Sequence, residues 1–188
     1  MFLKSILFWQ PRQSLFKILC RTSLGTKLLI ILNYLIWLIL AFVSYLLIKS
    51  NANIFWQLLL ATLFAEVVER FSKAFLFWSR PISKYKHNLP KGLVKSWYDT
   101  GSFPSGHTSK TFFFLLFLNQ YQIYDTNIFL IATIPLLLFR VVVGFHYPID
   151  ILGGLLVGFL SWSISHQITF PHVLVNFIKN IFDKIPLL

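Results

Sequence analysis

Long apolar stretches alternate with short polar breaks along this chain. Three stretches, at 26–48, 126–144 and 147–168, contain a single Lys, Arg or Asp each. Each is close to the roughly 20 residues that an α-helix needs to cross the hydrocarbon core of a bilayer. Two weaker stretches, at about 53–78 and 107–124, contain more charges or are shorter. The pattern predicts an all-α integral membrane bundle with about five transmembrane helices.

Both ends of the chain mix apolar and basic residues. Residues 1–21 combine aromatic side chains with four Lys or Arg residues and contain Pro11, and the tail at 171–188 has a similar mixture. Such mixtures favour helices that lie in the membrane interface. We therefore expect one membrane-embedded domain over residues 1–188, with an interfacial helix at 1–21, a transmembrane core at 26–168 and an interfacial tail at 171–188.

The composition excludes an ordinary soluble domain. Hydrophobic residues make up 56% of the chain and charged residues 12%, whereas soluble domains carry about 25% charged residues. The 17 Lys and Arg residues exceed the 6 Asp and Glu residues, for a net charge of +11. Nucleic acid could attract such a charge, but the basic residues gather at span ends and in one loop, which favours anionic lipid. The expected partner is the bilayer, with no nucleic acid.

Ionisable residues interrupt the second apolar stretch. In a bilayer they cost free energy unless they are paired or face a polar cavity. Glu66 and Arg70, and likewise Glu69 and Lys73, are four residues apart and share a helix face. Lys73 lies seven residues before Arg80, which corresponds to about two helical turns. Snorkelling of long side chains at a helix end is the alternative interpretation.

A polar break, "GSFPSGHTSK", occupies residues 101–110. Ser105 suits the N-cap of the following helix, and Gly106 lets a ligand approach the backbone closely. Free N–H groups and the dipole at a helix start bind anions, phosphate in particular. His107 would then lie beside the bound group. The alternative is an ordinary capped helix with an interfacial histidine.

A third polar group lies in "RVVVGFHYPID". His146 and Asp150 are spaced to share a helix face, and Pro148 suits the first turn of that helix. A carboxylate bonded to one imidazole nitrogen fixes the tautomer and leaves the other nitrogen free to act as a base or nucleophile. Arg140 ends the preceding span and could reach the same pocket. A structural Arg–Asp pair is the alternative.

Together the three groups form the patterns K-x6-R-P, P-S-G-H and R-x5-H-x3-D between residues 73 and 150. This combination resembles the type 2 phosphatidic acid phosphatase superfamily of membrane lipid phosphatases. The third motif of that family usually has Ser before the Arg, and here Phe139 takes its place. The phosphate pocket implied by the resemblance therefore lacks one hydroxyl.

The resemblance implies a phosphohistidine mechanism. His146 would be the nucleophile, Asp150 would orient it, and His107 would protonate the leaving oxygen and then activate water. Glu69 is expected to orient Lys73. No metal or other cofactor is expected, because beyond the paired glutamates no carboxylate cluster suits Mg²⁺. The implied phosphate-binding groups are Lys73, Arg80, Ser105, Gly106 and Arg140.

Several substrates fit a small family member of this kind. The resemblance implies a bacterial phosphatase of undecaprenyl pyrophosphate, phosphatidic acid, phosphatidylglycerophosphate or lipid A. Additional basic residues would serve a second phosphate and so favour undecaprenyl pyrophosphate, although attraction to anionic headgroups explains them equally well. These residues are Lys84, Lys86, Lys91, Lys95 and Lys110.

Other functions and the orientation stay open at this point. A lipid phosphotransferase would use the same motifs, and a lipid-binding or transport protein would be expected to have lost at least one of the key residues. The positive-inside rule places the motif loops in the cytoplasm. The resemblance implies a multi-pass protein of the bacterial cytoplasmic membrane with an extracytoplasmic active site, which is the orientation that we expect. The sequence leaves the oligomeric state open.

Overall fold

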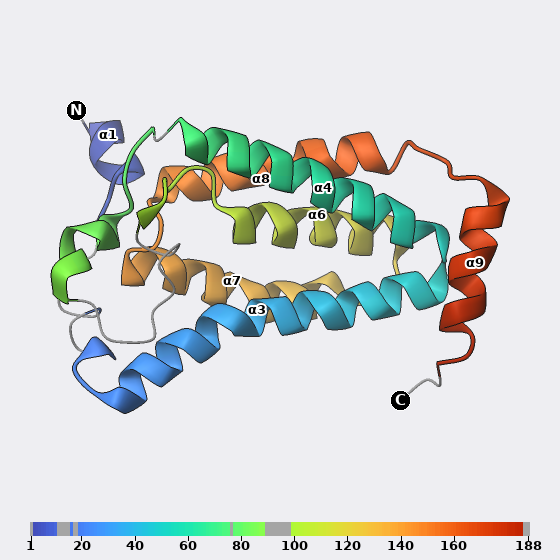
Figure 1. Ribbon diagram of the computed structural model, residues 1–188, viewed down its shortest axis with the longest axis horizontal. Coiled ribbons are helices and arrows are strands. Elements are labelled where there is room, and N and C mark those ends of the chain that lie inside the picture. The colour runs from blue at the N-terminus through green and yellow to red at the C-terminus, as the bar shows by residue number, and fades with distance from the viewer. Residues whose placement is uncertain (1, 11–15, 17–18, 76, 89–98, 186–188) are drawn as a thin grey trace.

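The computed structural model describes residues 2–10, 16, 19–75, 77–88 and 99–185. Within this part of the chain the regular structure is helical, apart from an isolated bridge between Ser79 and Gly101. The predicted all-helical bundle is confirmed. Its long helices run along the long axis of the molecule in Figure 1. They are α3 (Ser23–Ser50), α4 (Asn53–Ala74), α6 (Gly106–Tyr121), α7 (Thr126–Val143) and α8 (Pro148–Ser165).

Three of these helices, α3, α7 and α8, are long and apolar enough to cross a membrane. They correspond to the three strong apolar stretches of the sequence. The other two helices do not meet this length and composition requirement, for reasons that the sequence already shows. Helix α4 carries four ionisable residues in its second half, and α6 has 16 residues.

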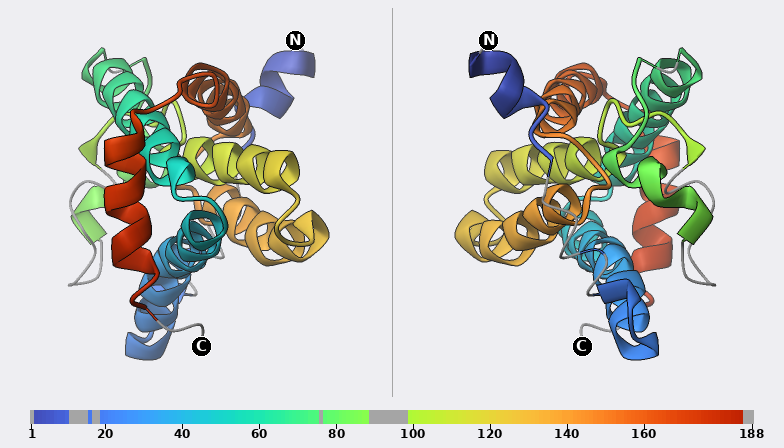
Figure 2. Two further views of the ribbon diagram at one scale, coloured as in Figure 1. Left: turned by 90° about the vertical axis from the view of Figure 1, so that its right-hand side faces the viewer. Right: turned by 90° about the vertical axis from the view of Figure 1, so that its left-hand side faces the viewer.

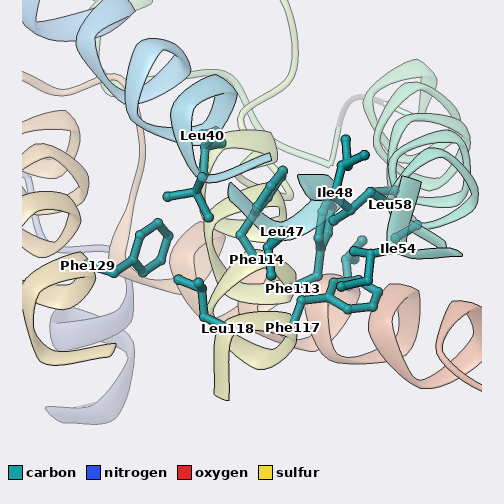
Figure 3. Close-up of a cluster of buried hydrophobic side chains, with 14 of the residues drawn as sticks. Leu40, Leu47, Ile48, Ile54, Leu58, Phe113, Phe114, Phe117, Leu118 and Phe129 are labelled. Atoms are coloured by element: carbon teal, nitrogen blue, oxygen red, sulfur yellow. The ribbon is translucent and has the colours of Figure 1, made fainter. Parts of the chain in front are cut away.

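Helix α6 contacts α3, α4, α7 and α8, and lies in the middle of the bundle when the helices are viewed end-on (Figure 2). Polar residues near its start, such as Thr108 and Ser109, are buried among protein rather than lipid. Further along, Phe113 and Phe117 are fully buried and pack with Leu47 of α3 and Ile54 of α4 (Figure 3). Lipid tails are as apolar as these side chains, so moving the side chains out of lipid gives little hydrophobic driving force. Close van der Waals packing between the helices holds the bundle together instead.

Small residues bring α8 close to α6. A Cβ atom on Gly154 would lie 2.7 Å from the main-chain oxygen of Ser105, and one on Gly158 would lie 2.5 Å from that of Ser109. The N–H of Ser105 donates to the main-chain oxygen of Asp150 over 3.0 Å. The second and third motifs therefore lie side by side at one end of the bundle.

The ends of the chain lie at opposite ends of the bundle (Figure 1). The predicted helix over 1–21 is not continuous: α1 spans Phe2–Leu7, and the chain leaves the helix before Pro11, which restricts the residue preceding it. Residues 11–15 and 17–18 lie outside the described part. In the predicted tail, α9 (His172–Phe182) crosses the far end of the bundle, buries Ile178 and exposes several apolar side chains.

Candidate active site

The motif residues converge at the end of the bundle near α1 and the 3₁₀ helix η1 (Pro81–Asn88). They line one pocket with a volume of about 220 Å³. It combines the end of α4, the residue before η1, the start of α6, the end of α7 and the turn before α8. The structure thus brings together six of the predicted site residues. The lining consists of Glu69, Lys73, Arg80, Thr100, Gly106, His107, Arg140 and His146.

His146 is held with one ring nitrogen available. Its Nδ1 lies 3.0 Å from the main-chain oxygen of Ser102 and 3.4 Å from Oδ2 of Asp150. A main-chain oxygen only accepts hydrogen bonds, so Nδ1 carries the proton and the lone pair is on Nε2. Nε2 lies 3.4 Å from Nη1 of Arg80 and 3.5 Å from Nη2 of Arg140. Nε2 therefore faces two guanidinium groups.

The surroundings of His146 favour its neutral form. Burial, reinforced by the positive charges of Arg80 and Arg140, lowers the pKa of His146 well below 6.5. The imidazole is therefore held in its uncharged form at neutral pH, which is the form that can act as a base or a nucleophile. Burial also lowers the pKa of Arg80 to about 10, so this guanidinium stays charged at neutral pH.

Asp150 is completely buried and accepts hydrogen bonds from several directions. The N–H of Tyr147 donates to Oδ2 over 2.7 Å, and the indole Nε1 of Trp78 donates to Oδ1 over 2.9 Å. The hydroxyl of Ser102 also donates to Oδ2. Trp78 and Ser102 were missed by sequence reasoning, although Ser102 lies within the polar break at 101–110. Together they fix the carboxylate beside His146.

Arg140 joins the two histidines. Its Nη1 lies 3.4 Å from Nε2 of His107, while Nη2 faces His146. Nη1 also donates to Oδ1 of Asn33, a buried residue of α3 that sequence reasoning missed. Among the described residues, Nε of Arg140 and Nε of Arg80 have no hydrogen-bond partner. Both guanidinium groups therefore retain unused donors, which suits an anionic ligand.

A tight turn places His146 relative to Arg140. Gly144 ends α7 with a φ of 91°, a backbone region that favours glycine. The chain can then fold back, so the main-chain oxygen of Arg140 accepts from the N–H groups of Phe145 (2.8 Å) and His146 (3.3 Å). The oxygen of Gly144 accepts from Ile82 over 2.9 Å, which ties this turn to η1.

Ser105 has the predicted N-cap role. Its side chain accepts from the N–H of Thr108 over 3.5 Å and from the hydroxyl of Thr108 over 3.0 Å. It is not among the residues that line the pocket, whereas the adjacent Gly106 is. Contact between the Ser105 hydroxyl and phosphate stays a prediction. Phe139, which stands where the family motif has Ser, packs against an apolar cluster containing Leu29 and Val143.

Two carboxylates on α4 hold the neighbouring basic residues. The Nζ of Lys110 lies 3.0 Å from Oε2 of Glu66 and 3.1 Å from Oε2 of Glu69. Glu69 also pairs with Lys73, as expected, and Glu66 pairs with Arg70 over 2.8 Å. Lys110 is therefore bound beside the pocket rather than lining it. Its contact with a second phosphate stays a prediction.

The loop lysines are only partly described. The Nζ of Lys84 donates to Oε1 of Gln10 over 2.9 Å, which ties the N-terminal segment to η1. The side chain of Lys86, together with Lys91 and Lys95, lies outside the described part of the chain.

Comparisons with known proteins agree with this geometry. Over 68 residues the chain is 37% identical to a protein of Escherichia coli strain K12 described as "Putative undecaprenyl-diphosphatase YbjG", a match that covers 36% of this chain and 34% of that relative. The match therefore spans about a third of the relative's length. No solved structure matches the chain. The profile of the PAP2 superfamily matches residues 54–174, from the start of α4 to the start of α9 and thus through every element that lines the pocket, and the chain belongs to this superfamily.

Proposed function

We propose that this protein is a membrane lipid phosphatase that transfers the phosphoryl group of its substrate first to His146 and then to water. The observation that carries the proposal is the position of His146: its Nδ1 faces a main-chain oxygen, and its Nε2 faces Arg80 and Arg140 in a pocket at the end of a membrane bundle. Phosphoryl transfer depends chiefly on alignment and on charge stabilisation, and these contacts supply both.

In the first step, Nε2 of His146 attacks phosphorus in line with the leaving oxygen. The P–N bond forms, the P–O bond to the lipid breaks, and His107, which takes up a proton as the anionic substrate binds, gives that proton to the departing oxygen. Arg80, Arg140 and Lys73 bind the nonbridging oxygens. The imidazole of His146 becomes positively charged in this step, and the buried carboxylate of Asp150 offsets that charge.

In the second step, His107 accepts a proton from water as the water oxygen attacks phosphorus. The P–N bond breaks, inorganic phosphate forms, and His146 returns to its neutral form. Both imidazoles lie beside the guanidinium of Arg140, which supports an acid–base group and a nucleophile that act on the same phosphate. A water molecule can therefore enter from the side that the lipid oxygen leaves.

The proposed reaction uses no metal ion. Lys73, Arg80 and Arg140 line the pocket with Glu69 as the single carboxylate among its described residues. Three cationic side chains repel a divalent cation and instead supply the charge stabilisation that a metal gives in other phosphoryl-transfer enzymes.

The substrate that we propose is undecaprenyl pyrophosphate. The name of the bacterial relative supports this choice, and so do the basic residues of the 84–95 loop. Lys110 could contribute only by leaving Glu66 and Glu69. Phosphatidic acid, phosphatidylglycerophosphate and lipid A phosphate are the alternative lipids, and an acceptor other than water would make the protein a phosphotransferase.

Phosphate release by the detergent-purified protein tests the proposal. The lipids to compare are undecaprenyl pyrophosphate, phosphatidic acid and phosphatidylglycerophosphate, each with EDTA and without added metal. Release should persist in EDTA, disappear in His146→Ala and continue in His166→Ala, since His166 bonds to Trp162 at the far end of α8. Absence of release from every lipid by folded protein would refute hydrolysis, and loss of release in EDTA would refute the metal-free mechanism.

A further inference from the structure

Glu69 places a carboxylate inside the cationic pocket. Its side chain lines the pocket, is 14% exposed, and binds both Lys73 and Lys110. The carboxylate also lies against the first residue of α6, because a Cβ atom on Gly106 would clash with Oε1 and Oε2 of Glu69. A negatively charged group of this chain therefore lies beside a proposed phosphate ligand and at the start of a helix.

This position favours an anionic oxygen. Lys73 supplies a positive charge, and the first turn of α6 adds its N–H groups and the positive end of its dipole. A carboxylate and a phosphate both present charged oxygen acceptors, so they compete for the same surroundings. We propose that Glu69 is an internal competitor of phosphate, whose carboxylate occupies Lys73 and the start of α6 in the free protein and withdraws when a phosphate group binds.

Lys110 gives the withdrawn carboxylate a second partner. It binds Glu69 from outside the pocket lining, and it also binds Glu66 one turn away on α4. A rotation of the Glu69 side chain can therefore release Lys73 while its carboxylate keeps an ion pair. This arrangement also accounts for a buried Lys on α6 that the hydrolytic steps do not use.

The competition reduces the affinity of the pocket for its product. Lys73, Arg80 and Arg140 would bind inorganic phosphate strongly, since like all anions it gains from a desolvated cationic site. A carboxylate within the same pocket opposes the phosphate charge and claims one of the cations. The inference rests on the proposed function only in requiring that this pocket bind a phosphate group.

Phosphate binding by Glu69→Gln tests the inference, because glutamine keeps the shape of the side chain and removes its charge. The Kd of inorganic phosphate, measured by equilibrium dialysis with radiolabelled phosphate, should fall by about tenfold or more. Glu66→Gln is the matched control: Glu66 shares Lys110 but does not line the pocket, so the Kd should change by less than about twofold. If Glu69→Gln does not fold, Glu69→Ala is measured in its place, with the same expected direction.

A purely structural role for Glu69 predicts the opposite change in the Kd of inorganic phosphate. If the carboxylate only positions Lys73, its removal would weaken phosphate binding, and an unchanged or higher Kd in Glu69→Gln would overturn the inference. An equal gain in Glu66→Gln would also overturn it, because the effect would then come from net charge alone. Dialysis measures binding without turnover, so the two proposals can fail separately. If the protein hydrolyses none of the lipids but Glu69→Gln binds phosphate more tightly, this inference holds and the proposed function is rejected.

Discussion

The carboxylate of Asp150 lies 3.4 Å from Nδ1 of His146, four residues earlier in the chain. The shorter contact of Nδ1, at 3.0 Å, is with the main-chain oxygen of Ser102. The main chain can therefore hold the Nδ1 proton without the carboxylate. In the proposed mechanism, the negative charge of Asp150 then matters mainly when His146 becomes charged as the P–N bond forms.

Replacement of Asp150 by Asn should therefore reduce kcat far more than it changes KM. In a Ser-His-Asp triad the corresponding change lowers kcat by about 10⁴-fold, chiefly because the histidine takes the wrong tautomer. Here the main-chain oxygen of Ser102 also holds the tautomer, so we expect a loss of kcat below that figure, from the missing charge alone. Trp78→Phe removes one hydrogen bond to Asp150 and keeps its charge, so its loss should be smaller. Steady-state kinetics of both variants decide the point, and a kcat for Asp150→Asn near that of the wild type would contradict the assigned role.

The depressed pKa of His146 predicts how activity depends on pH. A histidine whose pKa is lowered keeps its unprotonated, nucleophilic form at pH values below 6.5. The limb of kcat/KM that reports protonation of His146 should therefore lie below pH 6.5, with this group contributing no loss between pH 7.5 and 6.5. The profile should be measured with a monophosphate lipid and a diphosphate lipid, whose own phosphate groups titrate differently. A limb that lies at the same pH with both lipids then reports a group of the enzyme. An enzyme limb above pH 6.5 that Asp150→Asn shifts would contradict the prediction.

The sequence indicated most of the side chains that line the pocket, but not the residues that hold them in place. The spacing of His146 and Asp150 indicated a shared helix face. The two side chains do lie 3.4 Å apart, but α8 begins at Pro148, so His146 comes from the turn before the helix. Ser102 and Trp78 reach Asp150 from 48 and 72 residues away. Contacts across such separations depend on how the loops fold back over the bundle, which no local pattern specifies.

The same limit applies within the membrane bundle. Asn33 is a single amide within an apolar span, and a buried polar group of this kind signals a partner without identifying it. Its partner, Arg140, lies on a different helix. Lys110 shows how a local pattern can miss the partners that packing supplies. Its position one turn after His107 suggested a phosphate ligand, but the packing of α6 against α4 pairs it with the carboxylates of Glu66 and Glu69.

The contact between α8 and α6 predicts a packing defect on enlargement of Gly158. A Cβ atom there would lie 2.5 Å from the main-chain oxygen of Ser109, and the backbone cannot move away without shifting the start of α6. Gly158→Ala should therefore lower the free energy of unfolding by about 1–3 kcal/mol, as overpacking typically does. Thermal unfolding in detergent, followed by helical circular dichroism, measures the loss.

The control for that defect is Leu156→Ala, on the same helix at a side chain that is 60% exposed. It removes apolar volume from the lipid-facing surface and leaves the contact with α6 intact. Its melting temperature should stay close to that of the wild type. Equal losses in the two variants would show that α8 responds to any change, and would refute a specific role for the Gly158 contact.

The arrangement of the helices allows a direct test of orientation. The candidate active site lies at the end of the bundle with α1 and η1, and α9 lies at the other end (Figure 1). If the active site is extracytoplasmic, α9 is cytoplasmic, so a fluorescent protein fused after residue 188 should fluoresce and an alkaline phosphatase fused there should be inactive. The charge distribution favours the reverse. We expect the fluorescent fusion to fluoresce. Lys73, Arg80 and Arg140, to which the proposal assigns phosphate binding, add positive charge at the active-site end of the bundle whichever side of the membrane it faces. An active alkaline phosphatase fusion would place the candidate site in the cytoplasm and overturn the orientation implied by the family resemblance.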